Sequence, residues 1–306
     1  MNKLNIVVPC YNEETVLNTF YEKLTESLRN ADISWNIIFV NDGSTDNTLD
    51  IIRKLSENEN VDYISFSRNF GKESAIYAGL DSTNGDYVIL MDADLQDPPE
   101  LIPEMLKDVG NYDIVATRRT SRKGEPKIRS FFARNFYKII NRITHMELVD
   151  GARDYRIMTR PVVDSILELK EYNRFSKGIF EWVGFQTKWL EYENIERVDG
   201  ETSWSFWQLF KYSIEGIVSF TTAPLHVSTL VGIIFSIIAF IAIIVIILKT
   251  LIYGDPVSGW PSTISAILFV GGIQLFAIGM LGEYLAKIYL ETKNRPKYII
   301  EEEKLR

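Results

Sequence analysis

Cysteine and histidine are scarce in this sequence of 306 residues, which contains one cysteine, Cys10, and two histidines. A single cysteine excludes a disulfide bond within the chain, and it is typical of proteins that work in a reducing compartment. The histidines, His145 and His226, stand alone, so packed or interfacial roles explain them better than metal ligation.

An excess of positive charge is also absent. The formal net charge is −8, which argues against a nucleic-acid partner. Residues 1–9 run directly into a strand pattern and lack the longer apolar stretch of a signal peptide. We therefore expect the charged N-terminal part of the chain to stay in the cytoplasm.

Two long segments, residues 216–248 and 256–282, contain no Asp, Glu, Lys or Arg. Each exceeds the roughly 20 apolar residues that a helix needs to cross a bilayer. The sequence therefore predicts a domain, two transmembrane helices and a cytoplasmic tail, at residues 1–220, 226–249, 262–286 and 287–306.

The charges that flank these segments predict their orientation. The loop between the two predicted spans carries only Lys249 and Asp255, whereas the tail is rich in Lys and Arg. Since basic residues are retained on the cytoplasmic side, both ends of a multi-pass membrane protein are expected there. A buried helical hairpin is the alternative interpretation of the two apolar segments.

The first 120 residues alternate short apolar runs with helical patterns. Strands are predicted at residues 4–9, 35–41, 61–67, 86–91 and 113–117, with helices between them at 14–28, 45–57, 72–81 and 99–107. This rhythm predicts an α/β fold with a doubly wound sheet. Ligands of such sheets bind beyond the carboxyl ends of the strands, where Asp42, Asp92 and Asp94 fall.

Two segments of this domain have the pattern of helices that lie on a membrane surface. Between Arg118 and Arg142 there are nine basic residues and one acid, Glu125, with apolar residues at helical spacing. We predict an amphipathic interface helix at about 128–143 and a second, rich in Phe and Trp, at 205–220. For the first helix, packing on the core with a solvated basic face is the alternative.

The sequence Val88-Ile-Leu-Met-Asp-Ala-Asp-Leu-Gln places two carboxylates, Asp92 and Asp94, at the end of a buried strand. Carboxylate oxygens suit Mg²⁺ or Mn²⁺, which would take further ligands from water and from donor phosphates. An Asp-X-Asp pattern is common in proteins, so its meaning depends on the motifs around it.

Three motifs follow predicted strands in the order Pro9-Cys-Tyr-Asn-Glu-Glu, Val40-Asn-Asp-Gly-Ser-Thr-Asp-Asn-Thr and Asp92-Ala-Asp-Leu-Gln-Asp-Pro-Pro-Glu. Together they resemble the family 2 inverting glycosyltransferases, which have the GT-A fold, a Rossmann-like mixed sheet. With Gly151-Ala-Arg-Asp-Tyr-Arg and two C-terminal spans, the chain is more narrowly similar to polyprenyl-phosphate glycosyltransferases. These are the dolichol-phosphate mannosyltransferase and bactoprenol glucosyltransferase type, and the resemblance covers nearly the whole chain.

The resemblance assigns roles to particular residues. Those implied to bind the nucleotide are Pro9, Tyr11, Glu13, Val40, Asp42, Lys72, Asp92 and Ala93. Asp92 and Asp94 match the metal motif, with Gln96 as an outer ligand. Phosphate-binding roles are implied for Arg118, Arg156 and Arg197, and charge placement adds Arg129 and Arg134 on the acceptor side.

The Gly151-Ala-Arg-Asp-Tyr-Arg segment departs from the commoner family pattern at two positions. Arg153 replaces glycine and Tyr155 replaces phenylalanine, while Ser203 stands where the family often has lysine. The resemblance implies a catalytic base at Asp154. A phosphate monoester already carries a charge of about −1.5 to −2, so positioning of the acceptor is an equal alternative for this carboxylate.

The resemblance implies inverting transfer of a sugar from a nucleotide donor to a polyprenyl phosphate such as undecaprenyl phosphate. The product would be a lipid-linked monosaccharide for cell-envelope glycans. UDP-glucose is the favoured donor, with UDP-N-acetylglucosamine, UDP-galactose and GDP-mannose as alternatives. The apolar helices also leave a homo-oligomer open.

Two rival functions fit the sequence less well. A processive polysaccharide synthase needs more spans and usually carries Gln-X-X-Arg-Trp, which Gln186-Thr-Lys-Trp does not match. A membrane scaffold or transport subunit with a decayed transferase domain is the non-enzymatic alternative. The presence of Asp42, Asp92 and Asp94 argues against it.

Overall fold

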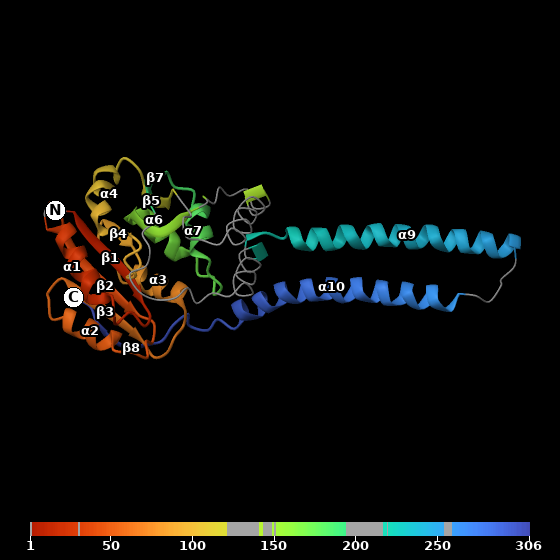
Figure 1. Ribbon diagram of the computed structural model, residues 1–306, viewed down its shortest axis with the longest axis horizontal. Helices are drawn as coiled ribbons and strands as arrows, with labels where there is room; N and C mark the ends of the chain where they lie inside the picture. The colour runs from red at the N-terminus through yellow and green to blue at the C-terminus, as the bar shows by residue number, and fades with distance from the viewer. Residues whose placement is uncertain are drawn as a thin grey trace. The chain divides into compact units, whose positions relative to one another are not determined.

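The computed structural model describes residues 2–29, 31–120, 141–142, 149, 151–193, 217–218, 220–253 and 259–306. The chain divides into two compact units, which we call the sheet unit (Met1–Ser213 and Arg295–Arg306) and the hairpin unit (Ile214–Asn294). Both chain ends belong to the sheet unit (Figure 1). Arg129, Arg134, Arg197 and nearly all of the two predicted interface helices lie outside the described residues.

The sheet unit alternates strands and helices, as the sequence predicts. In chain order they are β1 (Lys3–Cys10), α1 (Leu17–Leu28), β2 (Ser34–Asn41), α2 (Thr48–Leu55), β3 (Val61–Phe66), α3 (Lys72–Asp81), β4 (Tyr87–Leu90), the 3₁₀ helix η1 (Pro99–Leu101), α4 (Ile102–Asp108), β5 (Ile114–Arg119), β6 (Ala152–Thr159), α6 (Arg160–Glu168), α7 (Ser176–Trp182), β7 (Thr187–Tyr192) and β8 (Ile300–Lys304).

These strands form one eight-stranded sheet in the order β7-β5-β6-β4-β1-β2-β3-β8. Strands β4, β1, β2 and β3 are parallel, so their carboxyl ends lie at one edge of the sheet. Strand β6 runs antiparallel between β4 and β5, and β8 runs antiparallel to β3. The sheet is therefore mixed, as predicted.

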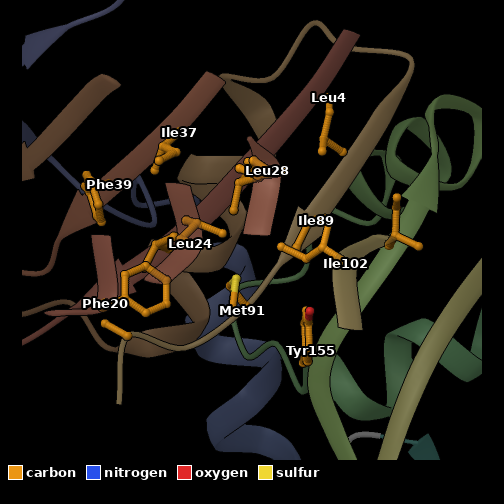
Figure 2. Close-up of a cluster of buried hydrophobic side chains, with 14 of the residues drawn as sticks. Leu4, Phe20, Leu24, Leu28, Ile37, Phe39, Ile89, Met91, Ile102 and Tyr155 are labelled. Carbon is orange, nitrogen blue, oxygen red and sulfur yellow. The ribbon is translucent and has the colours of Figure 1, made fainter. Parts of the chain in front are cut away.

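The core lies against both faces of the central strands. The apolar side chains of α1, among them Phe20 and Leu24, pack with the Leu4 side of β1 and with Phe39, as Figure 2 shows. The rings of Phe20 and Phe39 meet edge to face at 6.5 Å between centroids. Burial of each large apolar side chain contributes about 1.5–3 kcal/mol, which fixes the strand ends that carry the polar motifs.

Helix α3 covers the opposite face of β1 and approaches it closely at Gly79. A Cβ at this position would lie 2.2 Å from Cγ1 of Val7, so only glycine permits the contact. The packing matters because α3 begins at Lys72, a predicted site residue.

The hairpin unit consists of α9 (Ala223–Tyr253) and α10 (Trp260–Thr292), which run side by side (Figure 1). The rings of Phe235 and Phe269 pack at 5.3 Å, and the Tyr284 hydroxyl donates a hydrogen bond to the carbonyl oxygen of Thr221 over 2.8 Å. Both helices are long and apolar enough to cross a membrane. They contain the predicted spans at 226–249 and 262–286, whose place in a bilayer stays a prediction.

The end of the chain differs from the tail that the charge pattern predicts at 287–306. Helix α10 continues to Thr292, and β8 then adds an edge strand to the sheet. The sequence of β8, Ile300-Glu-Glu-Glu-Lys, lacks the apolar alternation of a strand. It pairs nevertheless, because backbone hydrogen bonds to β3 do not depend on the side chains.

Candidate active site

The carboxyl ends of β1, β2 and β4 border a cleft of about 340 Å³. Its lining includes Pro9, Tyr11, Glu13, Asp42, Lys72, Asp92, Ala93 and Asp94, which the sequence predicts as site residues. Val40 is buried in β2 beside Asp42 and does not line the cleft. The edge at which parallel strands end is where ligands of such sheets bind.

The loops that follow β1 and β2 hold each other in place at the mouth of the cleft. Asn12 adopts a left-handed φ of 55°, and its backbone N–H donates to Oγ of Ser44 over 3.0 Å. The next N–H, that of Glu13, donates to Oγ1 of Thr48 over 2.8 Å. Asparagine tolerates this backbone conformation better than most residues, so the motif residue Asn12 serves the turn itself.

Asp42 is buried where β2 ends, and it organises the loop before α3. Its Oδ1 accepts the N–H of Phe70 over 2.6 Å and its Oδ2 accepts the N–H of Gly71 over 2.9 Å. Burial raises the pKa of Asp42, and the two N–H donors act against that rise. Gly43 has a φ of 63°, and a Cβ there would lie 2.3 Å from the carbonyl carbon of Arg68, so the turn requires glycine.

Lys72 joins two carboxylates, that of Asp92, which follows β4, and that of Asp154 on β6. Its Nζ lies 2.7 Å from Oδ1 of Asp92 and 2.6 Å from Oδ2 of Asp154. Burial acts to raise the pKa of Asp154, but Lys72, Lys177 and Arg156 together outweigh it and hold that pKa well below its usual range. Desolvation acts to lower the pKa of Lys72, and the two carboxylates together raise it above its usual range. Both groups are therefore charged at neutral pH.

Arg156 lies beneath Asp154 on β6 and is only 2% exposed. Its Nη2 donates to the carbonyl oxygen of Arg153 over 2.9 Å, and its guanidinium lies 3.7 Å above the Phe180 ring centroid. Burial lowers the pKa of Arg156 to about 10, so it stays charged at neutral pH. Its guanidinium contacts backbone carbonyl oxygens and the Phe180 ring, and the phosphate contact implied by the resemblance stays a prediction.

Arg153, the residue that departs from the family glycine, holds the turn after the acidic pair. Its Nε donates to Oδ1 of Asp97 over 2.9 Å, and its Nη2 donates to Oε1 of Gln96 over 3.2 Å. The Tyr192 hydroxyl donates to the same Asp97 oxygen over 2.8 Å. The backbone N–H of Gln96 donates to Oδ1 of Asp94 over 3.1 Å. Gln96, a predicted outer metal ligand, thus presents its amide oxygen to Arg153.

Asp97 and Tyr192 are members of this cluster that the sequence analysis does not predict. Asp97 is completely buried, and burial raises its pKa while Arg153 acts against the rise. A buried carboxylate requires such a partner, since an isolated charge is costly in the interior. The unusual arginine at position 153 is the sequence signal that could have indicated a buried acid nearby.

Lys177 is a further cation that sequence reasoning missed. Glu73, the second residue of α3, accepts the backbone N–H of Ser176 over 3.0 Å and also accepts the Ser176 hydroxyl. This contact joins the first turns of α3 and α7, and Lys177 follows directly. The charge of Lys177 contributes to lowering the pKa of Asp154.

Arg118 lies at the end of β5, outside the residues that line the cleft. Its guanidinium pairs with the carboxylate of Glu191 on β7, and both side chains are about half exposed. Of the other predicted cations, Arg129, Arg134 and Arg197 lie outside the described residues.

The acidic pair fits a divalent cation in its chemistry. Asp92 and Asp94 both line the cleft, and carboxylate oxygens are the ligands that Mg²⁺ and Mn²⁺ prefer. Within the described residues, no three Asp, Glu, His or Cys side chains cluster as a complete metal site. An ion held here would therefore take its remaining ligands from a phosphate group and water.

Two protein families match this sequence. Residues 5–167 match Glycosyl transferase family 2, and residues 223–288 match the GtrB C-terminal hairpin. The chain belongs to glycosyl transferase family 2. Membership confirms the predicted glycosyltransferase.

Two relatives of similar length match nearly the whole chain. The chain is 44% identical to the bactoprenol glucosyl transferase of Shigella phage SfV, over 99% of each chain. It is 43% identical to the prophage bactoprenol glucosyl transferase homolog of Escherichia coli K12, over 97% of this chain and 98% of that relative.

A solved structure shows the same fold. Glucosyl-3-phosphoglycerate synthase from Mycobacterium tuberculosis, in complex with Mn²⁺, UDP-glucose and phosphoglyceric acid, matches with a TM-score of 0.50 at 18% identity. The match covers 71% of this chain and 78% of that one. This confirms the predicted GT-A fold of the family 2 glycosyltransferase, while the roles of individual residues stay predictions.

Proposed function

We propose that this glycosyltransferase transfers a hexosyl group from a nucleotide sugar to a polyprenyl phosphate. One observation carries the proposal: the family 2 domain and the GtrB hairpin occur together in a chain that is 43–44% identical, nearly end to end, to relatives named as bactoprenol glucosyl transferases. Those names also favour UDP-glucose over UDP-N-acetylglucosamine, UDP-galactose and GDP-mannose as the donor.

The cleft at the strand ends is the donor site in this proposal. The nucleoside lies against the loops that carry Pro9, Tyr11, Glu13 and Asp42, with its diphosphate toward Asp92. The rigid loops support this placement, because a preformed cleft needs little reordering when the donor binds.

Asp92, Ala93 and Asp94 lie at the diphosphate end of that donor. We assign Mg²⁺ or Mn²⁺ to the two carboxylates, since both line the cleft. The ion would stabilise the negative charge that develops on the leaving diphosphate. Lys72, paired with Asp92, adds a positive charge from the protein at the same place.

Asp154 acts in this proposal as a positioning residue. A carboxylate whose pKa is held far below neutrality accepts protons poorly, and Lys72 and Lys177 hold it there. The acceptor phosphate is already an anion, so its oxygen attacks the anomeric carbon directly. The new bond joins that oxygen to carbon 1 of the sugar as the bond to the diphosphate breaks. In-line attack inverts an α-linked donor to a β-linked lipid product.

The hairpin unit anchors the enzyme in a membrane, with the sheet unit at the cytoplasmic face. The length and apolarity of α9 and α10 support this placement, together with the sparsely charged loop between them. Cysteine labelling tests it, since the native Cys10 is buried and burial raises the pKa of its thiol, so it reacts poorly. A cysteine at Ser258 should react with an impermeant reagent from outside and one at Lys293 should not; the reverse pattern contradicts the topology.

The transfer reaction is tested with the full chain in nanodiscs that contain undecaprenyl phosphate. We expect radiolabelled UDP-glucose to give a product that partitions into organic solvent, in the presence of Mg²⁺ or Mn²⁺. The three other donors are compared at the same concentration, and Asp92→Asn is the inactive control. Nucleotide binding without a lipid-linked product from any of the four donors would refute the proposed acceptor.

A further inference from the structure

The segment that follows α10, residues 295–306, is an integral part of the sheet unit, and we call it the C-terminal segment. Its strand β8 pairs with β3, and the N–H of Ser67 extends the pairing by donating to the carbonyl oxygen of Ile299 over 3.0 Å. On the outer side, Arg53 of α2 forms an ion pair with Glu302 at 2.9 Å. The segment is thus fixed to two neighbouring elements.

Aromatic rings connect this segment to the cleft. The ring of Tyr298 stacks on that of Phe66 with centroids 4.9 Å apart and planes 15° from parallel. Phe66 in turn meets Phe70 edge to face at 5.8 Å. The N–H of Phe70 is one of the two donors that hold the carboxylate of Asp42. Three rings therefore lead from the C-terminal segment to a residue that lines the cleft.

A second set of contacts reaches α3. The Ser74 hydroxyl donates to the carbonyl oxygen of Lys297 over 3.2 Å. The Nζ of Lys297 lies 3.9 Å above the ring centroid of Tyr77, within the range of a cation–π interaction. Both partners are on α3, whose first residue is Lys72. The C-terminal segment therefore contacts both the loop before α3 and the helix itself.

The loop between these contacts has little regular structure of its own. Residues 67–71 connect β3 to α3 and include Gly71 at a φ of 97°. The Asp42 carboxylate holds the loop on one side, and on the other side it is held by the Phe66–Phe70 ring contact and by the hydrogen bond from Ser67 to Ile299. A loop held from two sides changes position when either support is removed.

We infer that Tyr298 is a positioning residue for the nucleotide donor, because it holds Phe66 and Phe70 so that Asp42 and Lys72 face the cleft. The inference rests on the proposed function for the donor site and is independent of the identity of the acceptor. Lys297 supports the same arrangement through α3. Since Lys293 and Asn294 alone separate α10 from this segment, the second helix of the hairpin leads directly into residues that shape the donor site.

Nucleotide binding to the full chain in nanodiscs tests the inference. We compare Tyr298→Ala and Tyr298→Leu, which remove the stacked ring, with Tyr298→Phe, which retains it. An aromatic pair contributes about 0.5–1.5 kcal/mol, so we expect the Kd for UDP to rise by about 2- to 12-fold in the first two variants and to stay unchanged in the third. If the wild type prefers GDP, the same series is measured with GDP.

A matched control separates positioning from attachment of the segment. Arg53→Ala removes the ion pair with Glu302 but leaves the rings in place, so nucleotide affinity should equal that of the wild type. Tyr298→Leu with lower thermal stability and unchanged UDP affinity would show a purely structural role and overturn the inference. UDP binding requires no lipid, so failure of the acceptor assignment appears separately, as wild-type protein that binds nucleotide without making lipid-linked sugar.

Discussion

The Nζ of Lys72 lies 2.6 Å from Oδ2 of Asp154, and this ion pair joins the start of α3 to β6 at the cleft. The same ammonium contacts Asp92, which follows β4, so one cation balances two carboxylates. Without Lys72, two like charges would face each other in a poorly solvated place. The stability of the folded protein should therefore depend on the charges of these three residues.

The pH dependence of unfolding should reveal this link. The pKa of Asp154 is lowered, so its stabilising contribution is present above the unfolded pKa of about 3.9 and is lost as pH falls. The pKa of Lys72 is raised, so its contribution is present below about 10.4 and is lost at higher pH. We expect the Tm of the wild type to exceed that of Lys72→Met most between these limits.

The difference in Tm between wild type and Lys72→Met should shrink as the pH is lowered below about 4, because the stabilisation of the charged Asp154 by Lys72 is lost there. Thermal unfolding of the full chain in detergent measures it. Lys72→Arg keeps a cation and should resemble the wild type in its pH profile. A difference that stays constant with pH would contradict the ion-pair explanation.

The acidic pair should control both catalysis and metal affinity. Asp92→Asn and Asp94→Asn should each lower kcat by about 100-fold or more, because less metal charge then stabilises the leaving diphosphate. Binding of Mn²⁺ in the presence of UDP, followed by electron paramagnetic resonance, should weaken in both. Asp50→Asn, on the surface of α2, is the control. Full turnover of either cleft variant in chelator would exclude this role.

Substitution of Lys177 should change the KM for the acceptor more than the KM for the donor. It lies where the Glu73–Ser176 contact joins α7 to α3, near Asp154, and it is partly exposed. We expect Lys177→Met to raise the KM for undecaprenyl phosphate about tenfold, with the KM for the donor within about twofold of wild type. Lys177→Arg should retain function, and Lys170→Met is an exposed control. A selective change in the donor KM would contradict the assignment.

Substitutions of Arg118, Arg129 and Arg134 should change the KM of different substrates. Arg118→Ala should raise the donor KM if Arg118 has the role on the donor phosphates that the sequence resemblance implies. Arg129→Ala and Arg134→Ala should raise the acceptor KM, because their basic segment is expected at the membrane surface. Steady-state kinetics with each substrate varied separately distinguishes the two groups. If all three variants changed both KM values equally, the basic segment would serve only as a membrane anchor.

Arg156 should contribute mainly to stability. Arg156→Met removes a nearly fully buried hydrogen-bond donor from the carbonyl oxygens of Arg153 and Asp154. Loss of these hydrogen bonds should lower the free energy of unfolding by about 1–3 kcal/mol. We expect the Tm to fall by about 5 °C. Nucleotide affinity measured well below the Tm should change little. Unchanged Tm with a raised acceptor KM would instead support the phosphate contact that the family resemblance implies.

The position of the cleft could be predicted because it lies where the parallel strands end. Short apolar runs that end in Pro9, Asn41 or Met91 indicated buried parallel strands, and the carboxyl ends of such strands meet at one edge. The positions of Asp42, Asp92 and Asp94 followed from this rule together with the family motifs. The two apolar helices could also be predicted from the sequence, since a long uncharged segment is typical of a helix that can cross a membrane.

Contacts between distant parts of the chain could not be predicted in this way. Glu73 and Ser176 are 103 positions apart, and neither belongs to a periodic pattern that would indicate its partner. The burial of Arg156 depends on Phe180 and on backbone carbonyls, which no local rule anticipates. Strand β8 was missed because edge strands pair through their backbone and can carry charged side chains on an exposed surface.

The pairing of β3 with β8 also has a consequence for biosynthesis. Arg53 and Glu302, which meet across this edge, are 249 positions apart, and both apolar helices are translated between them. At about 5–20 residues per second, the ribosome needs roughly 10 to 50 seconds to make the intervening chain. During that time the outer edge of β3 is without its partner, and an open edge is a template for aggregation. The nascent enzyme can therefore complete its sheet only after the helical hairpin has been synthesised.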